Sequence, residues 1–132
     1  MNTSIATARF SQAELDELHR MAHGAYLQGR YDQAVRYFWF ISLHAPTDLR
    51  YLKGLAAGLF MSRAFSEAFV AYSYLRQTAP EDPEVSCMLG NTLLLLGQQD
   101  EAKAHLEQAI RLPGAADEIT TRAHALLEFI AD

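Results

Sequence analysis

The sequence has one cysteine, no long apolar run and no cluster of basic residues. Because Cys87 has no second cysteine to pair with, an internal disulfide is excluded, which fits a reducing compartment. The longest strongly apolar run, residues 93–96, is far shorter than the ~18 residues of a membrane span, so we expect no stable membrane insertion. Residues 1–9 lack the apolar core of a secretory signal, and we therefore expect a cytoplasmic bacterial protein.

The charge balance argues against nucleic acid as a partner. The 132 residues include 11 Lys and Arg against 16 Asp and Glu, a net charge of −5, whereas proteins that bind nucleic acid present a basic surface. Half of the residues are hydrophobic, and the length suits one globular domain with its own core.

Signatures of catalysis are also missing. The sequence contains no glycine-rich phosphate loop, no paired-carboxylate motif and no Ser/His/Asp pattern, so we expect neither an enzyme nor a cofactor. His19 and His23 stand one helical turn apart, a spacing that metals use, but no third ligand lies near them in the sequence. Cys87 has no basic neighbour that would favour its thiolate, which indicates a structural cysteine.

What the sequence does contain is a repeat of 34 residues. Positions at this spacing share their character: Gly29, Arg63 and Gly97; Ala34, Ala68 and Ala102; Phe38, Tyr72 and Leu106. This period is that of the tetratricopeptide repeat, a pair of antiparallel helices. The sequence therefore predicts an all-α fold, a right-handed α-solenoid of three repeats (about 15–48, 49–82 and 83–116) with a capping helix at about 117–131. Residues 11–131 would form one domain, and residues 1–10 a flexible N-terminus.

Small residues recur where the helices of a pair should cross. Ala22, Ala56 and Gly90 on the first helices face the conserved-spacing alanines of the second helices, and short side chains allow close approach. Gly54 and Ala57 are expected to leave room for the backbone of a ligand.

The first helix of each repeat is expected to line a concave groove that binds an extended peptide with spaced apolar anchors. Methionines suit such a surface because they adapt to imperfectly shaped ligands. For Phe60 and Leu94 the alternative is packing inside the superhelix. The candidate groove residues are His19, His23, Tyr26, Leu27, Arg50, Lys53, Ala57, Phe60, Met61, Cys87, Met88, Asn91 and Leu94.

A run of aromatic residues lies on the second helix of repeat one. Since one helix face cannot hold them all inside, some of Tyr37, Trp39 and Phe40 must lie at its flanks or outside. The two interpretations are packing against the N-terminal segment or neighbouring helices, and a contact surface for a client or a second copy in a homodimer.

Several runs resemble one family. Residues 26–34 read YLQGRYDQA, residues 48–55 read DLRYLKGL, and residues 90–97 read GNTLLLLG. They resemble the class II chaperones of bacterial type III secretion, the LcrH/SycD kind. The resemblance implies a non-catalytic chaperone that holds an extended segment of hydrophobic translocator proteins in its groove before export. It assigns His19, Tyr26 and Phe60 to groove positions, with His19 where the family often has tyrosine. The alternative is a tetratricopeptide scaffold that joins folded partners of a secretion or other complex.

Overall fold

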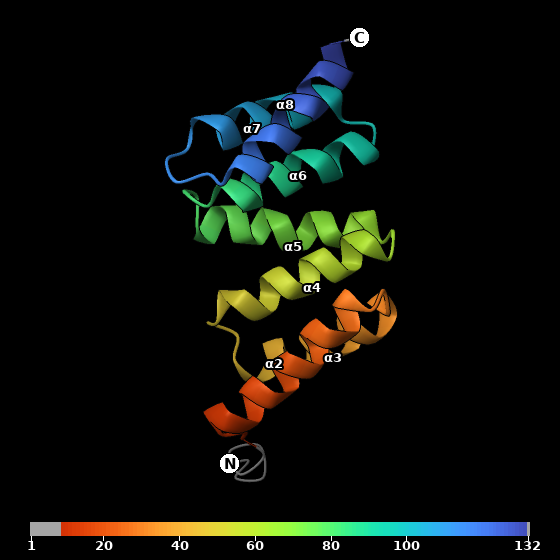
Figure 1. Ribbon diagram of the computed structural model, residues 1–132, viewed down its shortest axis with the longest axis vertical. Helices are drawn as coiled ribbons and strands as arrows, with labels where there is room; N and C mark the ends of the chain where they lie inside the picture. Colours follow the sequence, from red (N-terminus) through yellow and green to blue (C-terminus); the bar gives the residue numbers. More distant parts are fainter. Residues whose placement is uncertain (1–8, 132) are drawn as a thin grey trace. The chain divides into compact units, whose positions relative to one another are not determined.

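The computed structural model describes residues 9–131, and within them the chain forms α-helices and no strands (Figure 1). The fold class predicted from the 34-residue period is confirmed: helical hairpins follow one another, and a further helix ends the chain. The expected flexible N-terminus lies mostly outside the described residues, and the single domain over 11–131 stays a prediction. The helices are α2 (Gln12–Leu27), α3 (Tyr31–His44), α4 (Leu49–Met61), α5 (Phe65–Thr78), α6 (Pro83–Leu95), α7 (Gln99–Arg111) and α8 (Asp117–Ala131).

Contacts divide the helices between two compact units. Unit 1 ends at Ser62 and contains α2, α3 and α4, whereas unit 2 begins at Arg63 and contains α5 to α8. In unit 1, α3 packs against both α2 and α4; in unit 2, α6 packs against α5, α7 and α8. Each unit therefore has its own interior.

Side-chain caps begin three of these helices. The Ser11 hydroxyl accepts a hydrogen bond from the Glu14 amide (3.1 Å), and the Glu14 carboxylate accepts one from the Ser11 amide (2.8 Å), which is the capping box that the sequence predicts. Asp48 caps α4, and Asp82 caps α6 in front of Pro83. The two aspartates stand one repeat apart, so the same cap is used twice.

The interior of unit 1 is built around Phe38. Its ring is 3% exposed and belongs to one cluster with residues from all three helices: Leu15, Ala22, Ala25, Ala34, Ile41 and Tyr51. A Cβ atom added to Gly54 would overlap this ring. The expectation that Gly54 leaves room for a ligand is therefore wrong, because Phe38 already occupies that space.

Unit 2 shows the predicted close crossing of small residues. A Cβ atom on Gly90 would lie 2.7 Å from Leu106 and 3.1 Å from the Ala102 carbonyl oxygen, so α6 and α7 approach to backbone contact. The last helix, α8, adds Ile119 and Ala123 to a core cluster with Cys87, Leu106 and Ala109.

The turn before α5 differs from its two counterparts. Gly29 and Gly97 have positive φ (77° and 82°), and Arg63 adopts the same left-handed conformation at φ 67°. An L-residue with a Cβ atom is strained there, and glycine is not. The Arg63 guanidinium lies 5.6 Å from the centre of the Phe65 ring, which compensates in part.

We therefore expect Arg63→Gly to stabilise the chain, by about 0.5–1 kcal/mol after the greater freedom of glycine in the unfolded state is subtracted. Urea unfolding followed by circular dichroism measures the change. Arg63→Ala is the control, since it removes the guanidinium but keeps the Cβ atom. Equal effects of the two substitutions would contradict relief of backbone strain.

Candidate peptide-binding surface

Within unit 1, α2 and α4 each end in an aromatic residue followed by an exposed aliphatic one. These pairs, Tyr26 with Leu27 and Phe60 with Met61, stand 34 residues apart. Leu27 is 70% exposed and Met61 is 40% exposed, while the two aromatic side chains are half-buried. Large apolar side chains at such exposure are available to a ligand.

The aromatic members of these pairs also serve the fold. The Tyr26 ring packs edge-on against the Tyr31 ring, with 5.3 Å between their centres, and touches the core cluster of unit 1. Leu27 and Met61 are therefore the more accessible anchors, and Met61 adds the adaptability of an unbranched thioether.

His19 lies near the beginning of this surface, between α2 and aromatic residues of α3 and α4. Its ring is 5.2 Å from that of Tyr51 and 5.8 Å from that of Phe38, both edge-on. Burial lowers the pKa of His19, and the nearby positive charge of Arg50 lowers it further. The imidazole is thus held neutral, as part of the aromatic packing. The sequence named His19 as a groove residue but gave no sign of these contacts.

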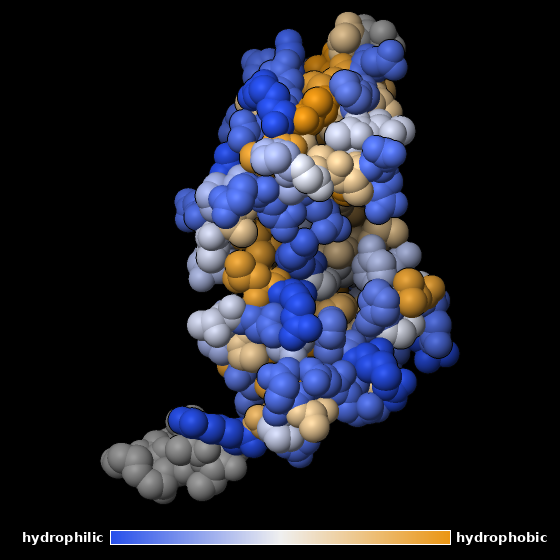
Figure 2. All heavy atoms as spheres, turned by 60° about the vertical axis from the view of Figure 1, so that its left-hand side comes forward, coloured by the Kyte–Doolittle hydropathy of each residue, from blue (hydrophilic) through white to orange (hydrophobic). Residues whose placement is uncertain are grey.

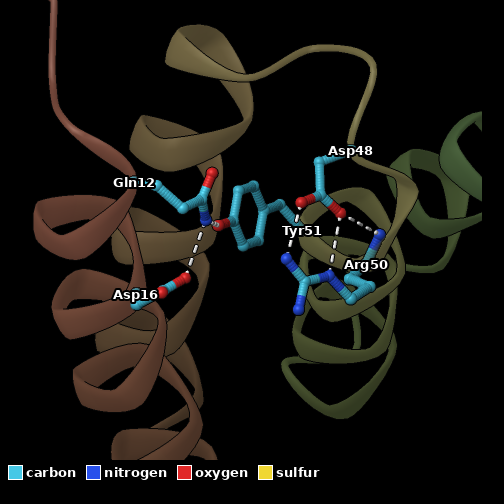
Figure 3. A network of polar contacts seen from close by, with 5 residues as sticks. All are labelled: Gln12, Asp16, Asp48, Arg50 and Tyr51. Carbon is cyan, nitrogen blue, oxygen red and sulfur yellow. Dashed lines mark hydrogen bonds and ion pairs between the residues drawn. The ribbon is translucent and has the colours of Figure 1, made fainter.

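The charged groups beside His19 are paired with one another (Figure 3). Arg50 donates two hydrogen bonds to Asp48, from Nε to Oδ1 (3.0 Å) and from Nη2 to Oδ2 (2.7 Å). This pairing lowers the pKa of Asp48 and raises that of Arg50. Gln12 donates to Asp16 (2.7 Å) and lies 3.5 Å from the Tyr51 hydroxyl. Because Asp48 occupies the guanidinium, the polar end of the surface is not a ready carboxylate clamp.

The lowered pKa of His19 predicts a pH-dependent stability. The unfolded chain takes up a proton near pH 6.5, before folded His19 does, so this contribution is present above about pH 6.5 and is lost as the pH falls below it. We expect His19→Phe, which keeps a ring but cannot titrate, to lose less stability between pH 7.5 and pH 5.5 than the parent chain. Urea unfolding at each pH tests this, with exposed His124→Gln as the control. Equal pH slopes for the parent and His19→Phe would refute the assignment.

The candidates on α6 are placed differently. Cys87 has no exposed surface; its Sγ lies 3.9 Å from the Ile119 carbonyl oxygen of α8, and burial raises the pKa of its thiol. Met88 is buried as well, with its sulfur 3.5 Å from Arg122 Nη1. Helix α8 covers both side chains, and we leave them out of the surface proposed below.

The other predicted residues keep some exposure. The structure places His19, His23, Tyr26 and Leu27 on α2, and Arg50, Lys53, Ala57, Phe60 and Met61 on α4, in unit 1; Asn91 and Leu94 lie half-buried on α6, in unit 2.

The aromatic run on α3 is divided between interior and surface. Tyr37 packs against the core cluster of unit 1, and Phe40 makes ring contacts with Phe10 (5.5 Å between centres) and His44 (4.6 Å). Trp39 is 56% exposed, as is Leu43 one turn later at 58%. That these residues form a contact surface stays a prediction. Figure 2 shows, on the face it displays, apolar residues in separate patches between hydrophilic ones.

Two further searches of the described residues gave negative findings. Among residues 9–131, no three His, Cys, Asp or Glu side chains are grouped so that they could hold a metal ion. None of the helices in that same part of the chain has both the length and the apolar character needed to cross a membrane.

Comparisons with known proteins agree with this architecture. Residues 83–115 match the family model of the tetratricopeptide repeat, and no curated protein matches the sequence. The chain is similar to PcrH from Pseudomonas aeruginosa, with 25% identity over 93% of this chain and 96% of PcrH and a TM-score of 0.85. It is also similar to the Yersinia enterocolitica chaperone SycD solved with a peptide of the translocator YopD, with 27% identity over 92% and 95% of the chains and a TM-score of 0.83.

PcrH has also been solved with the chaperone-binding region of PopD, and this structure matches the chain with 26% identity over 94% and 96% of the chains and a TM-score of 0.85. The resemblance indicated by the sequence motifs is thereby confirmed. The chain is a tetratricopeptide-repeat protein that resembles the type III secretion translocator chaperones in fold and over nearly its whole length.

Proposed function

We propose that the chain is a secretion chaperone that binds an extended apolar segment of type III secretion translocators and prevents its aggregation before export. The observation that carries the proposal is the pair of exposed anchors, Leu27 and Met61, at equivalent positions of α2 and α4. The similar chaperones support it, because SycD binds a peptide of YopD, and PcrH binds the chaperone-binding regions of PopB and PopD.

The physical logic is that of masking. A protein that must stay unfolded until export exposes apolar segments, and these promote aggregation. In an extended segment, side chains alternate in direction, so an apolar residue can reach each anchor while its neighbours remain in water. The ordering of the segment lowers the affinity, which keeps the client releasable. We further propose that the chain acts in the cytoplasm and by binding, without catalysis.

Co-purification tests this function against the scaffold alternative. The tagged chain is expressed in its native host, and the proteins bound to it are identified. We expect an amphipathic secreted protein that is insoluble alone and is displaced by a short peptide from its own sequence. Recovery of folded assembly components that no such peptide displaces would instead establish a scaffold.

A further inference from the structure

Unit 2 has an apolar pocket that is separate from the α2 and α4 surface. It is lined by Phe69 of α5, Leu93 and Leu96 at the end of α6, and Gln98 and Glu101 at the beginning of α7, and its volume is about 420 Å³. Three helices thus contribute to one hollow, which is large enough for an apolar side chain of a ligand.

Cationic groups continue the same helix faces beyond this pocket. Arg76 follows Phe69 by seven residues, which is two helical turns or about 10 Å along α5. His105 follows Glu101 by one turn on α7. The two groups interact electrostatically: burial lowers the pKa of His105, and the positive charge of Arg76 lowers it further. Arg76 and His105 therefore face each other from α5 and α7, and we call the stretch from the pocket to this pair the α5–α7 channel.

The Arg76 side chain lacks a partner that its burial calls for. Its Nε atom is buried and has no hydrogen-bond partner among the described residues. Buried donors are almost always satisfied in native proteins, so an unsatisfied guanidinium nitrogen at the edge of an apolar pocket indicates a missing acceptor. A carboxylate is the acceptor that matches a guanidinium best.

We propose that the α5–α7 channel binds an extended segment of a partner protein that carries an acidic residue three positions from a large apolar residue. The apolar side chain fills the pocket beside Phe69, and the carboxylate accepts hydrogen bonds from Arg76 with His105 beside it. An extended chain advances about 3.3 Å per residue, so the ~10 Å between the two places corresponds to three residues. The protein is acidic as a whole, with a net charge of −5, so this local match rather than overall attraction selects the partner.

Two blocked peptides test the channel directly: acetyl-Gly-Phe-Ser-Ser-Asp-Gly-amide, and the same peptide with Asn in place of Asp. Each is titrated into the full ¹⁵N-labelled chain at low salt and followed by NMR. We expect the Asp peptide to shift the signals of α5 and α7 around Phe69, Arg76 and His105, and to bind about ten-fold more tightly than the Asn peptide. Arg76→Gln should abolish this difference, and Leu96→Ser at the pocket should weaken both peptides.

Three results would overturn the proposal: equal affinity for the two peptides, shifts confined to α2 and α4, or sodium acetate alone reproducing the shifts. If Arg76→Gln fails to fold, Arg76→Lys, which keeps the charge but lacks the Nε donor, should reduce the discrimination. The double variant Leu27→Glu with Met61→Glu should bind the Asp peptide as the parent does. The channel therefore stands or falls independently of the chaperone function.

Discussion

Replacing Leu27 and Met61 together by glutamate is expected to abolish the recovery of soluble translocator client on co-expression. Each apolar side chain contributes about 1.5–3 kcal/mol when it is fully buried by a ligand, so losing two corresponds to an affinity roughly 10²–10⁴-fold lower. Fluorescence anisotropy with a labelled peptide from the co-purified client measures this loss. Both side chains project from the ends of their helices, and the substitutions should leave the fold intact.

Val70→Glu is the matched control. Val70 is 67% exposed, close to the 70% of Leu27, but lies on α5 in unit 2. It introduces the same charge on an equally exposed apolar residue and should leave client recovery unchanged. A double variant that still holds its client, or a Val70 variant that loses it equally, would remove the α2 and α4 surface from the binding site.

A second large effect is expected inside unit 1, where Gly54→Ala should destabilise the fold by about 1–3 kcal/mol. The added methyl group overlaps the Phe38 ring, and that ring is 3% exposed and surrounded by the core cluster, so it cannot swing away without displacing its neighbours. Urea unfolding gives the change in free energy.

Two further variants separate this overlap from a general effect of glycine in helices. Gly24→Ala in α2 meets no atom within 4 Å, and it should stabilise the chain by up to about 1 kcal/mol through helix propensity alone. Phe38→Leu should cost stability in the parent chain but recover part of it in Gly54→Ala, a coupling that a double-mutant cycle measures. Additive effects of the two changes would show that the ring and the methyl group do not meet.

The sequence predicts the helices well because their signals are local and repeat. The period of 34 residues, the cap at Ser11 and the proline at the start of α6 each fix a helix boundary without reference to the rest of the chain. Small residues at the crossing points, such as Gly90 opposite Ala102, are equally readable, since close approach needs them in every repeat.

The candidate site is less predictable, because equivalent positions in different repeats have different neighbours. Gly54 has no side chain, yet the pattern does not tell whether a ligand or Phe38 takes the space. Cys87 occupies an inner-helix position like its counterparts in the other repeats, but α8 covers it. Arg76 and His105 meet across unit 2 from two helices, and no sequence motif joins them.

The burial of Cys87 under α8 gives this chain a built-in reporter. The sulfur has no exposed surface, and it is the single thiol in the sequence. A thiol reagent must therefore wait until the last helix lifts from α6, and the labelling rate reads out how often that opening occurs. The chain can thus be asked, without any engineered label, whether a bound client holds its final helix closed.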